Sequence, residues 1–353
     1  MSPDIAVAFE RIPGYLDTAC YGLPAHATVA ALHRAAADWA VAATDPCALD
    51  HSVERLRAAF GAIVGAAAAD VALGGSVSQV VGMVAASLPP GARVVAAEHD
   101  FASVLFPFLA DPRLDVTLVP FEALADAVVP GVDLVAVSAV QSSDGRVADL
   151  AAVREAASAV GARTLVDISH GAAWLPITAT DFDVVVAAGY KWLTAPRGLA
   201  FAAISPAAYT GTTAWLRPVY ASWYGADRPW ESLYGPQLLA SASARRFDTS
   251  PPWQLVEAGA VALELLAAQD VARTHEYVVG LANAFREGIG MKPGTSAIVP
   301  VAGVDARALV REGVRATSRD GRSRFSFYLY NNMADVAAGI AAVRASSLAA
   351  VAS

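Results

Sequence analysis

Short uncharged apolar runs alternate along this chain with longer Ala-rich amphipathic stretches. Runs this short and this apolar are typical of strands that are buried on both faces of a sheet. We predict strands at Arg93–Ala97, Val116–Val119, Leu134–Val137, Thr164–Val166 and Asp183–Ala187, and helices at Val53–Ile63, Ser76–Leu88 and Leu150–Val160. This order predicts an α/β fold with a parallel sheet covered on both faces, in which functional residues collect at the carboxyl ends of the strands.

The composition excludes several classes of protein. Hydrophobic residues make up 56% of the chain and charged residues 16%, which excludes a disordered polypeptide. The mean hydropathy is +0.44, but the charge-free stretches 71–92 and 198–216 are interrupted by Gly, Ser and Pro, so we expect no membrane-spanning helix. The net charge of −8 argues against a nucleic-acid partner.

The length of 353 residues predicts more than one domain. A segment rich in aromatic residues, Pro and Gly, residues 209–253, separates the alternating region from a helix at Gln254–Ala268, a strand at Ser323–Leu329 and a helix from Met333. We assign residues 1–20 to an N-terminal segment, 21–250 to a large domain and 251–353 to a small α+β domain. The absence of a signal-like N-terminus and the presence of only Cys20 and Cys47 predict a cytoplasmic protein without a Cys-rich metal site.

Three motifs stand where a site is expected. Gly75, Ser76 and Val77 follow an apolar segment and open a helix, so they predict an anion site, although they also suit a plain turn and helix cap. Asp167 and His170 follow a strand, where Asp167 can pair with a cationic ring nitrogen or only cap a turn, and His170 can be a core residue. Lys191 follows the most apolar strand, and burial would lower its pKa and make the amine a nucleophile.

Together these motifs predict a site for pyridoxal 5′-phosphate, which needs a phosphate cradle, an acid at the pyridine nitrogen and an amine for its aldehyde. A chain carrying these motifs resembles the class V aminotransferase family, from Tyr15–Ala19 to the strand Arg324–Asn331. The resemblance implies the fold of the type I pyridoxal-phosphate enzymes, with a mostly parallel seven-stranded sheet. It also implies that Arg324 binds the carboxylate of an amino-acid substrate, the alternative being a structural ion pair.

Further positions carry over from the family. The residue that stacks on the cofactor ring is His99 if the chain follows the desulfurases and Phe101 if it follows kynureninase. Ala139 replaces an Asn that touches the cofactor, so that contact is either lost or moved to Gln141. Thr249 and Ser250 lie in a segment that resembles the one reaching the phosphate of the neighbouring subunit, which implies a homodimer with shared active sites.

The chain also departs from the family pattern. Ala188 and Tyr190 replace two usual phosphate ligands, so the backbone around Gly75 is expected to bind more of the phosphate. The stretch 314–322 before the Arg324 strand lacks the desulfurase Cys, and Cys20 and Cys47 are distant in sequence. The resemblance therefore implies a carbon–sulfur lyase acting by direct β-elimination, with Tyr190, Tyr21 or His170 as the acid.

Within the family the chain resembles the ergothioneine-pathway lyase, which cleaves hercynylcysteine sulfoxide to ergothioneine, pyruvate and ammonia. The trimethylammonium group of that substrate suits an aromatic site formed by Trp215, Trp223, Tyr224 and Trp230, which could equally pack at an interface. Other enzymes of the same cofactor remain alternatives, namely an aminotransferase, an epimerase or a cysteine/selenocysteine lyase, as does a non-catalytic cofactor-binding protein.

Overall fold

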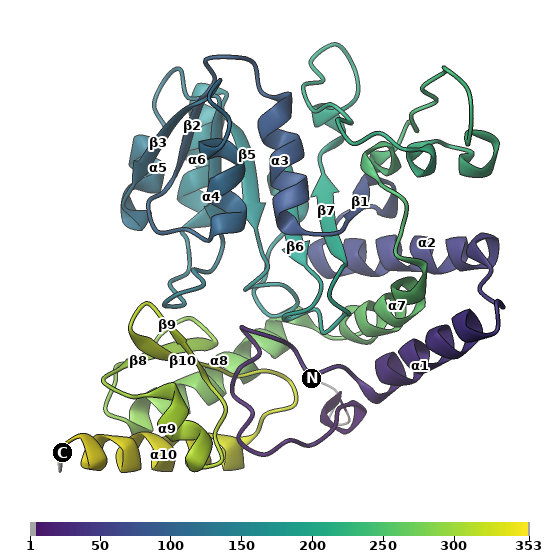
Figure 1. Cartoon of the computed structure of the whole chain (residues 1–353). Coiled ribbons are helices and arrows are strands. Elements are labelled where there is room, and N and C mark those ends of the chain that lie inside the picture. Colours follow the sequence, from purple (N-terminus) through teal and green to yellow (C-terminus); the bar gives the residue numbers. More distant parts are fainter. Residues whose placement is uncertain (1–4, 352–353) are drawn as a thin grey trace.

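A seven-stranded sheet forms the centre of the computed structural model, which describes residues 5–351 (Figure 1). Its strands, in spatial order, are β1 (Val71–Gly74), β7 (Ala200–Ile204), β6 (Val184–Ala188), β5 (Arg163–Asp167), β4 (Leu134–Ser138), β2 (Arg93–Ala97) and β3 (Asp115–Val119). Only β7 runs against its neighbours, so the carboxyl ends of the other six strands lie on one edge. The predicted α/β fold and mostly parallel sheet are confirmed.

Successive strand residues point to opposite sides, and helices cover both faces of the sheet. The edge strand β3 is the exception, because its residues are largely exposed, and the expectation of a strand buried on both faces is wrong there. On one face Val94 and Val184 pack with α3 (Val77–Ser87) and α4 (Ala102–Leu109). On the other face, strand residues such as Val95 and Val185 pack with a second set of helices: α2 (Pro46–Val64), α5 (Leu124–Ala127), α6 (Leu150–Val160) and α7 (Trp253–Ala267). The two-sided apolar core accounts for the high mean hydropathy.

Helix boundaries follow local capping chemistry. The Asp45 carboxylate accepts hydrogen bonds from the first free N–H groups of α2, and the helix ends at Gly65 in the left-handed conformation. Asp149 and Gly161 bound α6 in the same way. The predicted helix Leu150–Val160 is therefore confirmed residue for residue.

A smaller body carries a three-stranded antiparallel sheet of β8 (Ile298–Ala302), β10 (Arg322–Ser326) and β9 (Thr317–Arg319) (Figure 1). It is packed with α8 (Val271–Gly288), α9 (Ala306–Arg311) and α10 (Met333–Val351). The strand predicted to continue to Leu329 ends at Ser326, since the chain then turns and the Asn331 side chain accepts from Tyr328 N.

The N-terminal segment joins the two bodies. Tyr15 and Asp17 form bridges with Arg315 and Ser326 of the small body, and α1 (His26–Ala40) then packs on α7. The domain limits at residues 20 and 250 stay predictions, and α7, just beyond the second limit, packs against α1 and α2.

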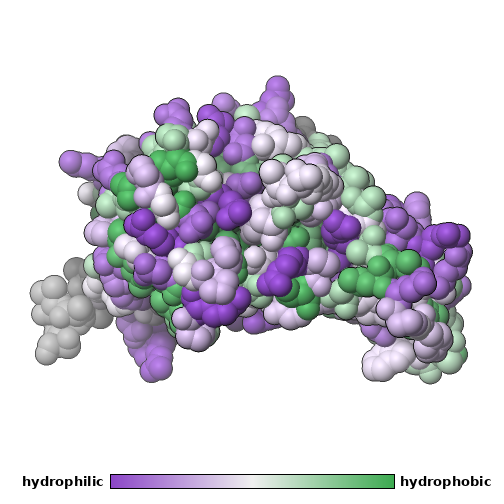
Figure 2. Space-filling model, turned by 90° about the horizontal axis from the view of Figure 1, so that it is seen from above, coloured by the Kyte–Doolittle hydropathy of each residue, from purple (hydrophilic) through white to green (hydrophobic). Residues whose placement is uncertain are grey.

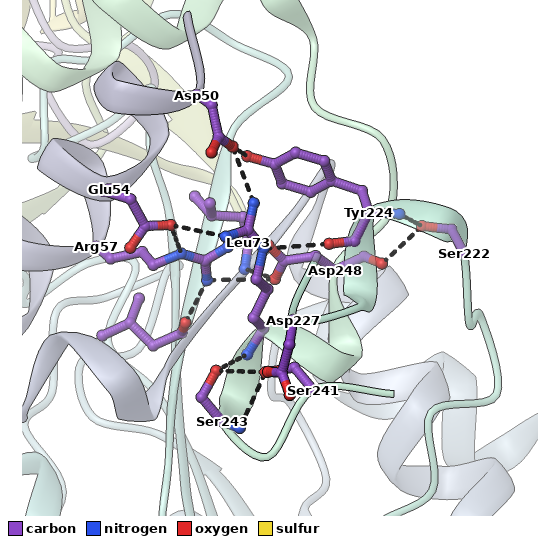
Figure 3. Close-up of polar contacts among 12 residues, drawn as sticks. Asp50, Glu54, Arg57, Leu73, Ser222, Tyr224, Asp227, Ser241, Ser243 and Asp248 are labelled. Carbon is purple, nitrogen blue, oxygen red and sulfur yellow. Dashed lines mark hydrogen bonds and ion pairs between the residues drawn. The ribbon is translucent and has the colours of Figure 1, made fainter. Parts of the chain in front are cut away.

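Residues 209–252 contain only short 3-10 turns, and a buried ion pair anchors this segment to the sheet (Figure 3). Arg57 of α2 pairs with Asp248, and the exposed fractions of the two side chains are 3% and 0%. Asp248 Oδ1 also accepts from Leu73 N at 2.8 Å, and Arg57 Nη1 donates to Val71 O at 2.6 Å. This network fixes β1, which leads directly into the Gly75 turn.

Polar and apolar residues are intermingled on the face seen from above in Figure 2. Within residues 5–351, no helix is long and apolar enough to cross a membrane.

Candidate active site

The carboxyl ends of the parallel strands border a cavity of about 160 Å³. Gly75, Ser76 and Val77 contribute from the turn after β1, Asp167 from the end of β5, and Lys191 from the turn after β6. The three motifs singled out in the sequence therefore line one cavity. They meet because parallel strands bring distant loops to the same edge of the sheet.

Lys191 is the central cation of this cavity. Its side chain is buried, and its Nζ lies 2.8 Å from His170 Nε2. Burial lowers the pKa of Lys191 to about 8, and the nearby Asp167 carboxylate opposes that change. Burial also lowers the pKa of His170 well below its usual range, with the Lys191 charge adding to the effect. Lys191 can therefore act as a nucleophilic amine beside a neutral imidazole.

Asp167 closes the buried end of the cavity. Its Oδ1 accepts from Ser169 N at 2.7 Å, and the Ser169 hydroxyl in turn accepts from Ala188 N at 2.9 Å. Burial raises the pKa of Asp167, while the Lys191 charge lowers it. The carboxylate is thus held rigidly between β5 and β6, with one oxygen available for a cationic partner.

Phe101, and not His99, faces the lysine. The Phe101 ring lines the cavity, and its centroid lies 5.0 Å from Lys191 Nζ. The His99 side chain is 82% exposed and lies only near Glu98. Asp100, which the sequence analysis did not single out, fixes this turn: its oxygens accept from Phe101 N at 2.6 Å and from Ser138 N at 2.7 Å. Of the two candidates, Phe101 is the one that lines the cavity, and which of them stacks on the cofactor stays a prediction.

The cavity that Gly75, Ser76 and Val77 line also holds an arginine that was not predicted from the sequence. The Arg197 side chain lines the cavity, with its guanidinium carbon 4.7 Å from the centroid of the Tyr190 ring. Ser76 caps α3 by accepting from Gln79 N, and Gly75 N donates to Gln79 Oε1 at 2.8 Å. Arg197 could have been predicted as a site residue from its charge, because it follows Lys191 by six residues in an otherwise uncharged stretch.

Arg324 is 1% exposed and lies on β10 of the small body. Its Nη1 donates to the Ser142 carbonyl at 2.5 Å and to the Ser142 hydroxyl at 3.1 Å, while its Nε has no partner. Burial lowers the pKa of Arg324 to about 10, and the Arg319 charge contributes. No carboxylate of residues 5–351 lies within ion-pair distance of Arg324, so the structural ion pair is not found.

Other predicted residues lie around the cavity rather than in it. Gln141 is buried with an unpartnered Nε2. Thr249 and Ser250 line a second cavity, which shares Gly75 and Gly198 with the first.

The aromatic segment is placed differently from the cation–π expectation. Trp223, Tyr224 and Trp230 contact one another and Trp253 of α7, and Trp215 packs under Arg163. None of these rings lines the Lys191 cavity of this chain. Their role as a site for the substrate cation therefore stays a prediction, with packing at an interface as the alternative.

The N-terminal segment brings Cys20 and Tyr21 to the site. Gly22 N donates to Tyr190 O at 2.9 Å, and a Cβ on Gly22 would lie 1.9 Å from the Lys191 carbonyl oxygen, so only glycine fits. The Tyr21 ring lies 5.3 Å from the Tyr190 ring. Cys20, remote in sequence from the Arg324 strand, has its Sγ 3.9 Å from Arg319 Nη2.

Comparison with known proteins assigns this arrangement to a family. Residues 74–310 match the model of the family described as aminotransferase class-V, which is more than half of the chain. The chain belongs to the class-V aminotransferase family. It is also 26% identical over 321 residues, 84% of each chain, to an uncharacterized aminotransferase, YcbU, of Bacillus subtilis strain 168.

Solved structures of the same fold include the cysteine desulfurase CsdA of Escherichia coli, with 19% identity, a TM-score of 0.79 and 97% of both chains covered. They also include the cystine C–S lyase C-DES in complex with cysteine persulfide, with 15% identity, a TM-score of 0.80, and 94% of this chain and 97% of that chain covered. The cysteine desulfurase of Thermococcus onnurineus NA1 has 16% identity and a TM-score of 0.80, with 98% of both chains covered. These likenesses confirm the fold.

The cofactor of this class-V chain is pyridoxal 5′-phosphate, and the residues present fit it. The cavity offers an amine of lowered pKa, an acid held against the sheet and a helix start beside Arg197. The buried atoms Gln141 Nε2, His170 Nδ1 and Arg324 Nε have no partner in the described chain. Since buried polar atoms are rarely left unpaired, these three point to ligand groups that complete the site.

Proposed function

We propose that this class-V enzyme is a carbon–sulfur lyase that releases the sulfur substituent of an S-substituted cysteine by β-elimination. The observation that carries the proposal is the buried Lys191 amine, 2.8 Å from a neutral His170 and in the same pocket as Asp167. An amine with a pKa of about 8 can both bind the cofactor aldehyde and accept a proton.

Pyridoxal phosphate, when bound, supplies an electron sink for the bond cleaved at the substrate Cα. Asp167 would hold the proton on its ring nitrogen, and Phe101 would cover one face of the ring. Arg197 and the start of α3 would bind the phosphate, replacing the ligands lost at Ala188 and Tyr190. The chain's own charges thus orient the cofactor from both ends.

Arg324 would bind the substrate α-carboxylate. Because its Nη1 is committed to Ser142, the edge formed by Nε and Nη2 is left for a two-pronged contact with a carboxylate. A carboxylate bound there orients the Cα proton toward Lys191, which removes it. His170, in contact with Lys191 Nζ at 2.8 Å, would position the amine for this step, and burial lowers the pKa of Lys191 so that it can accept the proton.

Departure of the sulfur needs a proton donor. The Tyr190 hydroxyl is a candidate, since the ring lines the cavity and burial raises the pKa of the phenol. The others are His170 and Tyr21, whose ring is tilted against that of Tyr190. A good leaving group such as a sulfoxide sulfur removes the need for a thiol nucleophile, in keeping with the Cys-free stretch 314–322.

Hercynylcysteine sulfoxide is the substrate that we propose on the resemblance to the ergothioneine-pathway lyase. Elimination from this sulfoxide gives pyruvate, ammonia and a sulfenic acid, which a low-molecular-weight thiol reduces to ergothioneine. The net charge of −8 does not repel its trimethylammonium cation, although the aromatic rings around Trp223 lie outside the cavity. A homodimer is part of the proposal.

The test is a panel of S-substituted cysteines and their sulfoxides, incubated with the cofactor-loaded enzyme and assayed for pyruvate and by mass spectrometry. We expect pyruvate from hercynylcysteine sulfoxide with wild type and with the paired variants Cys20→Ser and Cys47→Ser. No pyruvate from any sulfoxide would overturn the proposal. Loss of pyruvate in Cys20→Ser alone would show instead that the thiol is required.

An aminotransferase is the second candidate, because the curated relative YcbU carries that name. Transamination would convert the bound cofactor to its pyridoxamine form and leave the sulfur substituent in the keto-acid product. The same mass-spectrometric panel therefore separates the two activities.

A further inference from the structure

Three arginines share one face of the small sheet. In the antiparallel register Arg319 lies opposite Arg322, and Thr317 lies opposite Arg324. Directly opposed residues of an antiparallel pair point to the same side, as do residues two apart along a strand. Arg319, Arg322 and Arg324 thus lie on the face that Asp17 of the N-terminal segment contacts through Thr317 Oγ1.

Arg319 has no acidic partner. Its Nη1 donates to the Ser318 carbonyl at 2.7 Å and its Nη2 contacts Cys20 Sγ at 3.9 Å. No carboxylate of residues 5–351 lies within ion-pair distance of its guanidinium. By contrast, Arg322 on the same face lies 3.6 Å from Asp320 and its side chain is 40% exposed.

The charge of Arg319 acts on the active site. Burial is the main cause that lowers the pKa values of His170, Lys191 and Arg324, and repulsion by Arg319 contributes to each. Asp17 is the carboxylate beside this cluster, and burial raises its pKa while its Oδ2 accepts from Thr317. Lys191, Arg319 and Arg324 together therefore carry more positive charge than the neighbouring carboxylates offset.

The present inference rests on the proposed function, in which two of these three cations already have a role. Lys191 binds the cofactor and Arg324 binds the α-carboxylate, whereas Arg319 is unassigned. Its half-buried guanidinium lies at Cys20, two residues before Gly22, which contacts the Lys191 turn. A cation in this position favours an anionic ligand over a neutral one.

We propose that Arg319 is a specificity residue that binds a second anionic group on the substrate, carried by the substituent beyond the sulfur. The substrate class is then an S-substituted cysteine whose substituent bears a carboxylate. Arg324 and Arg319 together act as a pair of receptors for a dicarboxylate, and a neutral substituent leaves Arg319 without a partner.

Binding is measured first, by calorimetry on the cofactor-loaded enzyme with succinate, glutarate and adipate, each compared with its half-amide. Because a charge-assisted hydrogen bond is stronger than a neutral one, we expect at least one dicarboxylate to bind roughly tenfold more tightly than its half-amide. Arg319→Gln should abolish this preference, and Arg319→Lys should keep part of it. Arg322→Gln, on the same hairpin face, should keep all of it.

Turnover is measured with S-(2-carboxyethyl)cysteine sulfoxide and its carboxamide, as the ratio of their kcat/KM values. The inference expects a ratio well above one in wild type that falls toward one in Arg319→Gln. A purely structural role would lower both kcat/KM values and leave the ratio unchanged, and that outcome overturns it. If neither sulfoxide releases pyruvate while the calorimetric preference holds, the lyase proposal fails and the anion site stands.

The inference also fails if no dicarboxylate is preferred in wild type, or if Arg322→Gln removes the preference as fully as Arg319→Gln. Circular dichroism of each variant checks that the β9–β10 hairpin and the fold are retained.

Discussion

Lys191 has a 6% exposed side chain at the end of a fully buried strand, and its chemistry follows from that burial. Water stabilises an ammonium ion far better than a protein interior does, so the neutral amine is favoured. The amine contacts His170 and is attracted by the Asp167 carboxylate, so these two residues hold it in place. The chain has one other lysine, the exposed Lys292, which provides a control within the same molecule.

The lowered pKa of Lys191 can be tested by reductive trapping. The apoenzyme is treated with pyridoxal phosphate and borohydride at a series of pH values, and the labelled peptide is identified by mass spectrometry. Because burial lowers the pKa of Lys191 from 10.5 to about 8, labelling should be lost as the pH falls through about 8 rather than near 10. Lys191→Ala should remove the label, and Lys292→Ala should keep it. A midpoint near 10, or a label on Lys292, would contradict the assignment.

At the scale of elements, the Arg57–Asp248 pair connects α2, β1 and the segment before Thr249 (Figure 3). Both side chains are almost completely buried, so each charge depends on the other. The pair therefore positions two parts of the site at once: the Gly75 turn and residues 249–250.

Asp248→Ala should lower the free energy of unfolding by about 3–5 kcal/mol, because it leaves the buried guanidinium of Arg57 with only the half-exposed Glu54 as an acidic partner. Cofactor affinity should fall as well, since Leu73 N loses its acceptor next to the cradle. Urea unfolding and cofactor titration measure the two effects. The double variant Arg57→Met/Asp248→Ala should recover part of the stability.

The exposed pair Arg228–Glu231 is the matched control for this experiment. Glu231→Ala should change the free energy of unfolding by less than about 1 kcal/mol, because solvent screens an exposed ion pair. Equal effects of Asp248→Ala and Glu231→Ala would refute the anchoring role.

Some elements could be predicted from the chain and others could not. The strand at Arg93–Ala97 and the helix at Leu150–Val160 were found because their apolar residues and caps are local signals. The strand β7 was missed, since three of its five residues, Ala200–Ile204, are Ala, which is depleted in strands. Its place between β1 and β6 is decided by tertiary packing.

At the scale of the whole molecule, the irregular segment 209–252 presents apolar side chains to solvent. Between residues 219 and 239 the exposed large hydrophobic residues are Val219, Tyr220, Trp230, Leu233, Tyr234, Leu238 and Leu239. A group of this size is typical of an interaction surface. It supports the homodimer predicted from the sequence, in which Thr249 and Ser250 reach the partner's phosphate.

Subunit mixing tests that arrangement. Lys191→Ala and the double variant Thr249→Val/Ser250→Ala should each be impaired alone at limiting cofactor. A refolded mixture should regain activity, because a mixed dimer contains one site with Lys191 from one subunit and Thr249 and Ser250 from the other. Gel filtration gives the oligomeric state, and a mixture no more active than its components would argue against shared sites.

From the amino-acid order follow the α/β class and the cofactor, because strand periodicity and the placement of Asp167 and Lys191 after apolar strands are local signals, whereas the role of Arg324 is implied only by the resemblance to the family and stays a prediction. Which of His99 and Phe101 faces the lysine was decided only by the turn that Asp100 holds. The approach of Arg197 to Tyr190, and of Cys20 to Arg319, was likewise invisible. The Arg197 contact depends on how the turn after β6 folds back on itself, whereas the contact of Cys20 with Arg319 joins segments that are distant in sequence and forms only because the N-terminal segment packs against the small body.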